Sequence, residues 1–135
     1  MPPKMKVSDC LREFQTGGLR RTPDGKPFSD VIESERTPRR ERDIADHPSL
    51  KPQSFLRQIV YAVLPLGEGI LADPFMGSGS TIAAAEAVGV RAIGVERHLE
   101  YYEMSRNAIP KLAVLKTTSD GSSASQEQLE QLKLF

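Results

Sequence analysis

A glycine-rich stretch between a short apolar run and an alanine-rich segment constrains this chain more than any other feature. Residues 72–81 read Ala-Asp-Pro-Phe-Met-Gly-Ser-Gly-Ser-Thr and directly follow the apolar run. The residue before a proline is driven toward extended backbone, so a strand should end at Asp73. Gly77 and Gly79 can adopt the positive φ of a tight turn and let a ligand approach the backbone closely. The stretch therefore predicts a strand, a turn and a helix whose first N–H groups face a ligand.

The turn matches neither of the two common phosphate-binding patterns. A phosphate loop needs a lysine after its last glycine, and no lysine lies between Pro52 and Ile109. A dinucleotide-binding turn needs a third glycine where this chain has Ile82. The second apolar run ends at Glu96, 19 residues after Gly77, which is close to the spacing of one strand–helix–strand unit. Glu96 could accept hydrogen bonds from both hydroxyls of a ribose, so a nucleoside is favoured, with an ordinary strand–helix–strand unit as the alternative.

Residues 73–81 resemble the S-adenosylmethionine loop of DNA amino-methyltransferases, which methylate adenine N6 or cytosine N4. The usual form is Asp-Pro-Phe-x-Gly-Ser-Gly-Thr-Thr, and here Ser80 replaces the first threonine while keeping the hydroxyl. Upstream, residues 47–52, His-Pro-Ser-Leu-Lys-Pro, resemble the family's His-Pro-x-x-Lys-Pro element. The order of the two motifs is that of the β subgroup, in which the cofactor half follows the catalytic half.

This resemblance implies an S-adenosylmethionine site and a fold class. The fold would be α/β, an incomplete Rossmann-like methyltransferase fold with part of a parallel sheet and flanking helices. Lys51 could pair with the carboxylate of the cofactor, although a surface loop cap is the alternative role for His47 and Lys51. The implied cofactor-binding residues are His47, Lys51, Asp73, Pro74, Phe75, Gly77, Ser78, Gly79, Ser80 and Glu96.

The chain lacks the motif with which the resembled family holds its target base. In that motif a polar residue precedes Pro-Pro and an aromatic residue, which together hold a base flipped out of the duplex. The only Pro-Pro here, at residues 2–3, is followed by Lys4. We therefore assign no catalytic residue and expect DNA methylation to need a complementary N-terminal half. A non-catalytic remnant or interaction module is the competing hypothesis, and whether the chain alone is an enzyme stays open.

Residues 1–46 are predicted to be irregular. They are rich in proline, glycine and charge and contain only short apolar runs, a composition typical of segments that cover a partner or remain disordered. Two basic spots could meet DNA phosphates. The alternative is solvated loop charge beside acids such as Glu41. The candidate DNA-binding residues are Arg20, Arg21, Arg39 and Arg40.

Residues 47–115 are predicted to form the cofactor-binding half-domain. Pro52 suits the first turn of a helix, and a helical apolar stripe follows it and leaves Arg57 nearer the other side. A last helix is expected from residue 98, with an interruption at Pro110. Its inward side is predicted to carry Leu99, Tyr102, Arg106 and Ile109.

Residues 116–135 are predicted to be a flexible tail. A linker of serine, threonine and glycine precedes a short apolar segment at the end of the chain. The last five residues resemble the peptide with which bacterial proteins bind the replication sliding clamp. The alternative is an amphipathic tail that folds back on the core. The residues implied in the clamp contact are Gln131, Leu132, Leu134 and Phe135.

Length and composition limit the size of the fold and the compartment expected for this chain. Its 135 residues suffice for one small domain but are short for a complete methyltransferase sheet. Lysine plus arginine and aspartate plus glutamate both number 18, so no overall charge indicates nucleic acid, although a neutral total does not exclude a local basic face. The single cysteine, Cys10, can form no intrachain disulfide, and no apolar run is long enough to span a membrane. We expect a cytoplasmic protein with no membrane partner and assign no metal site.

Overall fold

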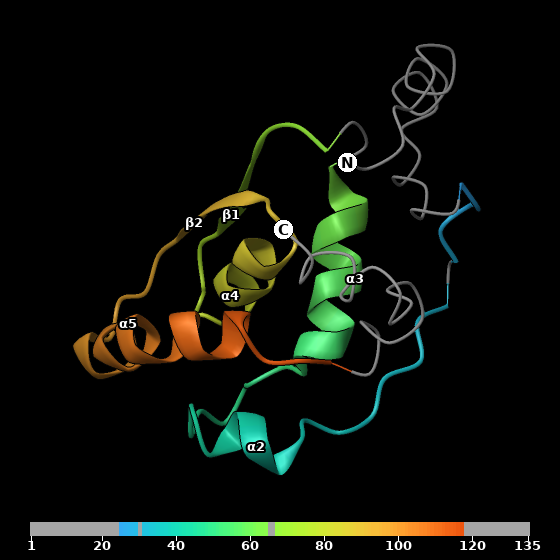
Figure 1. The fold of residues 1–135 in the computed structure, drawn as a ribbon. Coiled ribbons are helices and arrows are strands. Elements are labelled where there is room, and N and C mark those ends of the chain that lie inside the picture. The colour runs from blue at the N-terminus through green and yellow to red at the C-terminus, as the bar shows by residue number, and fades with distance from the viewer. Residues whose placement is uncertain (1–24, 30, 65–66, 118–135) are drawn as a thin grey trace, which may run out of the picture.

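The computed structural model describes residues 25–29, 31–64 and 67–117 (Figure 1). Arg20 and Arg21, most of the predicted tail and the proposed clamp peptide lie outside the described residues. The elements in chain order are α2 (Arg39–Arg42), α3 (Gln53–Val63), β1 (Ile70–Asp73), α4 (Ser80–Ala87), β2 (Arg91–Gly94) and α5 (Leu99–Ala113).

β1 and β2 pair in parallel, with Ile70 opposite Arg91 and Asp73 opposite Gly94. Parallel strands need a crossover connection, and α4 provides it. Leu71 and Ala92 belong to the apolar cluster that contains the buried face of α4, so the helix covers one face of the strand pair. The predicted α/β architecture, part of a parallel sheet with flanking helices, is confirmed.

α4 lies at the centre of the fold, between α3 and α5 (Figure 1). Its consecutive residues Ala83, Ala84 and Ala85 are fully buried. Ala83 belongs to a cluster with residues of α5, whereas Ala84 and Ala85 belong to a second cluster with residues of α3 and the strands. The small side chains let neighbouring elements approach the helix from several sides. The helix predicted from the alanine-rich segment is therefore confirmed, and its composition explains its central position.

Arg57 contradicts the prediction that it lies away from the core. It is buried, and its Nη2 donates to the backbone carbonyls of Leu112 at 3.0 Å and Ala113 at 3.1 Å. Carbonyls at the end of a helix have no partner within the helix, and a cation is favoured there by the helix dipole. Arg57 therefore caps the C-terminus of α5. Periodicity missed this role because the aliphatic stem of an arginine can pack like an apolar side chain.

Glu41 likewise contradicts the expectation of a solvated charge. It lies in α2, a short helix within the segment predicted to be irregular, and is only 1% exposed. Its Oε2 accepts the N–H of Gln53 at 2.9 Å, one of the free donors at the start of α3. Burial raises the pKa of Glu41, because desolvation outweighs this hydrogen bond and the attraction of Arg40 and Arg57. Residues 39–42 therefore contribute a buried cap to the core.

α5 differs from its prediction in two ways. It continues through Pro110 to Ala113, since a proline removes one helical N–H without forcing this helix to end. Its buried residues are Ser105, Ala108 and Leu112. Of the four residues predicted to face inward, Ile109 alone packs against the core, whereas Leu99 is 72% exposed and Tyr102 is 42% exposed. The backbone of Gly79 lies against Ser105 and Ile109, so this side of the helix packs on the glycine loop.

Candidate functional site

The glycine loop forms the turn that joins β1 to α4. Asp73 shapes its start, because its Oδ1 accepts the Phe75 N–H at 3.0 Å and its carbonyl accepts the Val95 N–H at 2.9 Å. Gly77 has φ +54° and Gly79 has φ +81°, a region that strongly favours glycine. The predicted tight turn is therefore confirmed.

Both glycines are also required by packing. A Cβ at Gly77 would lie 2.9 Å from the ring of His47, and a Cβ at Gly79 would lie 2.6 Å from Cγ1 of Ile109. Both separations are shorter than van der Waals contact. The sequence predicted these glycines for the close approach of a ligand, whereas the structure gives a packing reason that holds with or without one.

His47 brings the two sequence motifs together in space. Its ring lies against Gly77 and makes an edge contact with Tyr101, with 4.4 Å between ring centroids. Its Nδ1 accepts the Ser49 N–H at 3.1 Å, so the neutral ring carries its proton on Nε2. The imidazole is therefore held between the glycine loop and the first turns of α5.

Glu96 connects the end of β2 to the glycine loop. Its Oε2 accepts the Gly77 N–H at 3.1 Å, and its Oε1 accepts the His98 N–H at 2.7 Å. The hydrogen bond from His98, with a smaller contribution from Gly77, lowers the pKa of Glu96. The carboxylate is therefore ionised at neutral pH. Each oxygen keeps a further lone pair that a ligand hydroxyl could use.

A cavity of about 460 Å³ opens between these residues. Tyr101 and His98, at the start of α5, complete its wall. The cavity thus combines an ionised acceptor, aromatic rings and a tight backbone turn. Motif reasoning did not assign Tyr101, although its place shortly after Glu96 was an available signal. Five predicted cofactor residues line this cavity: His47, Pro74, Phe75, Gly77 and Glu96.

The other predicted cofactor residues do not line this cavity. Asp73 shapes the turn, Gly79 packs on α5, and Ser78 and Ser80 are buried. Lys51 is exposed, and its Nζ donates to the Ser49 carbonyl at 3.1 Å. It lines a different cavity, so the structure does not bring its amine to the glycine loop.

A buried polar network supports the glycine loop from behind. The Gln53 side chain is fully buried, and its Nε2 donates to the Ser80 carbonyl at 2.8 Å. Ser80 is the first residue of α4, and the backbone N–H of Gln53 is the group bound by Glu41. Sequence reasoning missed Gln53, because a single glutamine at a helix start carries no periodic or motif signal.

The described members of the predicted DNA-binding set already have protein partners. Arg39 Nε lies 3.9 Å from Asp43 Oδ1 in an exposed pair. Arg40 Nη2 donates to the Lys116 carbonyl at 2.7 Å, which ties α2 to the segment after α5. Over the described ranges, no cluster of His, Cys, Asp or Glu is arranged to hold a metal ion. Within those same ranges, no helix combines the length and apolar character that crossing a membrane requires.

Comparison with known proteins identifies the family. A model of the N6/N4 methyltransferases, described as DNA methylase, matches residues 3–107, which is more than half of the chain. The chain belongs to this DNA methylase family. The resemblance inferred from the glycine loop and the His-Pro-x-x-Lys-Pro element is therefore confirmed.

Individual relatives match only part of their own length. The chain is 37% identical over 86 residues to the type II methyltransferase M2.DpnII of Streptococcus pneumoniae, and 33% identical over 95 residues to the DNA adenine methyltransferase YhdJ of Escherichia coli strain K12. Each match covers 64% of this chain and 32% of the relative, so the chain spans about one third of the length of these proteins. A solved structure described as a DNA modification methylase from Thermus thermophilus, complexed with S-adenosyl-L-methionine, shares 22% identity with a TM-score of 0.43, over 67% of this chain and 42% of that chain.

Proposed function

We propose that this chain is the S-adenosylmethionine-binding part of a DNA methyltransferase acting on adenine N6 or cytosine N4. The observation that carries the proposal is the meeting of His47, Gly77 and Glu96 at one cavity. His47 belongs to one family motif and Gly77 to the other, and the cavity supplies the acceptor that a ribose needs. Membership of the DNA methylase family supports the choice of cofactor and of DNA as substrate.

The residues around the cavity fit a nucleoside. Glu96 would accept the ribose hydroxyls through its remaining lone pairs, and the exposed ring of Phe75 with Tyr101 would cover the base. When bound, S-adenosylmethionine supplies an activated methyl group. The residues of this chain would bind and orient that cofactor.

A complementary N-terminal half is proposed to complete the enzyme. The Pro-Pro-aromatic motif that would hold the target base is missing from this sequence. The strand face opposite α4 leaves Ile70 52% exposed and Ile93 58% exposed, whereas parallel sheets are normally covered on both faces. Helices from the other half would cover this face, and further strands would extend the sheet at its edges. Such an assembly would work in the cytoplasm, where it meets DNA.

The alternative is a non-catalytic module that binds a sliding clamp through Gln131, Leu132, Leu134 and Phe135. It rests on the sequence alone, because these residues lie outside the described ranges. A peptide of residues 126–135 should then bind a bacterial clamp in an anisotropy titration. If the peptide with both Leu134→Ala and Phe135→Ala binds the clamp as the wild-type peptide does, this alternative is ruled out.

Isothermal titration calorimetry with S-adenosylmethionine tests the proposed cofactor site. Glu96→Ala should weaken binding by at least about tenfold, because it removes a charged hydrogen-bond acceptor. Glu103→Ala is the matched control, since Glu103 is an exposed acid on α5 that does not line the cavity. Wild-type affinity in both variants would exclude Glu96 from the site.

A further inference from the structure

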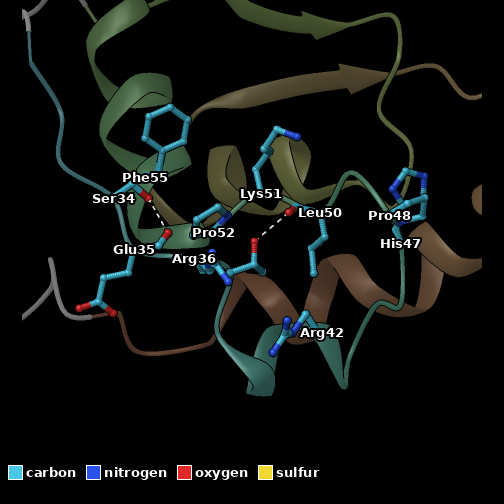
Figure 2. Close-up of a pocket in the computed structure, with 11 residues that line it drawn as sticks. Ser34, Glu35, Arg36, Arg42, His47, Pro48, Leu50, Lys51, Pro52 and Phe55 are labelled. Atoms are coloured by element: carbon cyan, nitrogen blue, oxygen red, sulfur yellow. Dashed lines mark hydrogen bonds between the residues drawn. The ribbon is translucent and has the colours of Figure 1, made fainter.

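A second cavity, of about 620 Å³, lies beside the turn that carries His47 (Figure 2). The segment before α2, α2 itself and the loop that leads into α3 all contribute to its wall. The cations Arg36, Arg42 and Lys51 line it, with Glu35 as the single acid. In Figure 2 the carboxylate of Glu35 points away from the other labelled side chains. The interior of the cavity is therefore basic.

Two of the three cations of this cavity are available to a ligand, whereas the Lys51 amine donates to the Ser49 carbonyl. Within the described ranges, the side chains of Arg36 and Arg42 form no hydrogen bond or ion pair, whereas the neighbouring Arg39 and Arg40 both do. The acid of α2, Glu41, is buried as the cap of α3 and does not neutralise the exposed surface of that helix.

The arrangement of the charges suits a chain of phosphates better than a single one. Figure 2 shows the guanidinium of Arg42 and the amine of Lys51 apart, with Leu50 between them. A lone anion would be held by cations that converge on one point, whereas a nucleic acid strand carries a charge at every repeat. Pro48 and Phe55 add apolar wall against which a sugar or base can pack.

We propose that the cavity walled by Arg36, Arg42 and Lys51 binds the sugar–phosphate backbone of a DNA strand. This inference rests on the proposed function, because a methyltransferase must hold DNA next to its cofactor. His47 lines both this cavity and the glycine-loop cavity, so a strand bound here lies beside the cofactor. The residues proposed to contact phosphate in this region are therefore Arg36 and Arg42 rather than Arg39 and Arg40.

Fluorescence anisotropy with the full chain and a labelled DNA duplex tests the site across a series of salt concentrations. The double variant Arg36→Gln, Arg42→Gln should bind more weakly, and its log–log salt slope should be shallower by about 0.9 for each lost phosphate contact. The loss should be the same for two unrelated duplex sequences, because phosphate contacts carry no sequence information. Arg36→Lys with Arg42→Lys should keep the wild-type slope, since the charge is retained.

Matched controls separate this site from general electrostatic attraction. Arg91→Gln with Arg106→Gln removes the same charge from exposed residues that do not line the cavity, and it should leave the slope near that of the wild type. An equal loss in both glutamine pairs would overturn the inference, and so would complete displacement of DNA by inorganic phosphate at matched ionic strength.

Cofactor calorimetry on the same variants distinguishes this inference from the proposed function. The glutamine pair at Arg36 and Arg42 should bind S-adenosylmethionine as the wild type does. If the chain binds the cofactor but its DNA binding does not depend on these arginines, the phosphate site is overturned and the cofactor site is not. Arginine-dependent DNA binding without cofactor binding would overturn the cofactor assignment and leave the phosphate site standing.

Discussion

The two sides of α4 are held by different kinds of contact. On the glycine-loop side, backbone groups carry most of the bonds. The Phe75 N–H donates to nearby Asp73, and the Gly77 N–H donates to Glu96 at the end of β2. On the other side, side chains connect residues far apart in sequence: Gln53 bonds to Ser80 27 positions away, and Arg57 to Leu112 55 positions away. The loop is therefore shaped by backbone turns and by contact with the end of β2, whereas buried side chains make the longest-range bonds behind it.

Substitutions at two glycines with positive φ would separate the free-energy cost of packing from the cost of backbone strain. Gly79→Val should cost about 2–5 kcal/mol of unfolding free energy, because φ is +81° and the new Cβ meets Ile109. Gly89→Ala is the control, since Gly89 has φ +75° with nothing within 4 Å of the added atom. It should cost only about 1–2 kcal/mol. Urea unfolding followed by circular dichroism measures both, and equal losses would remove packing as the cause.

Removing one long-range bond would test the network directly. Gln53→Met should cost about 0.5–1.5 kcal/mol, because it removes the buried hydrogen bond from the Gln53 side chain to the Ser80 carbonyl. Gln58→Met is the matched change in the same helix, where Gln58 bonds only to Ser54 one turn away and is half-buried. That control should change stability by no more than about 0.5 kcal/mol. If the two variants unfold at the same urea concentration, the network does not stabilise the fold.

The difference between the two sides explains what could be predicted from the sequence. The strand, turn and helix around Gly77 follow from local rules for proline, glycine and alanine. The end of the second apolar run and its spacing from Gly77 identify the acid Glu96. The inward positions of Glu41 and Arg57 could not be predicted, because each depends on helix ends supplied by distant segments. The prediction of which side of α5 faces the core was wrong for a related reason. The buried residues Ala108 and Leu112 of this helix pack with Ala83 of α4 and with residues before α3, contacts that the apolar pattern of α5 alone does not specify.

The smallest expected effect concerns the charge of Glu41. Its pKa is raised by burial, so the folded state holds a proton more tightly than the unfolded state does. Stability from this group is present at acidic pH and is lost as the pH rises through the raised pKa. Glu41→Gln keeps an acceptor for the Gln53 N–H without the ionised form.

The glutamine variant should therefore equal or exceed the wild type in stability near neutral pH. The difference should narrow as the pH falls toward 4.5, the ordinary value of the carboxyl group. Urea midpoints of both proteins across this range give the measurement. If the urea midpoint of the wild type rises relative to that of the variant as the pH increases, the raised pKa of Glu41 is contradicted.

Chemical-shift mapping of S-adenosylmethionine binding tests the central claim most directly. The amides of Gly77 and His98 donate to Glu96 at the glycine-loop cavity, whereas Lys51 lines the other cavity. We predict that titration of the labelled chain shifts the Gly77 and His98 amides strongly and the Lys51 amide much less. Shifts centred on Lys51, or saturating cofactor without any shift at Gly77 and His98, would contradict the assignment of this cavity.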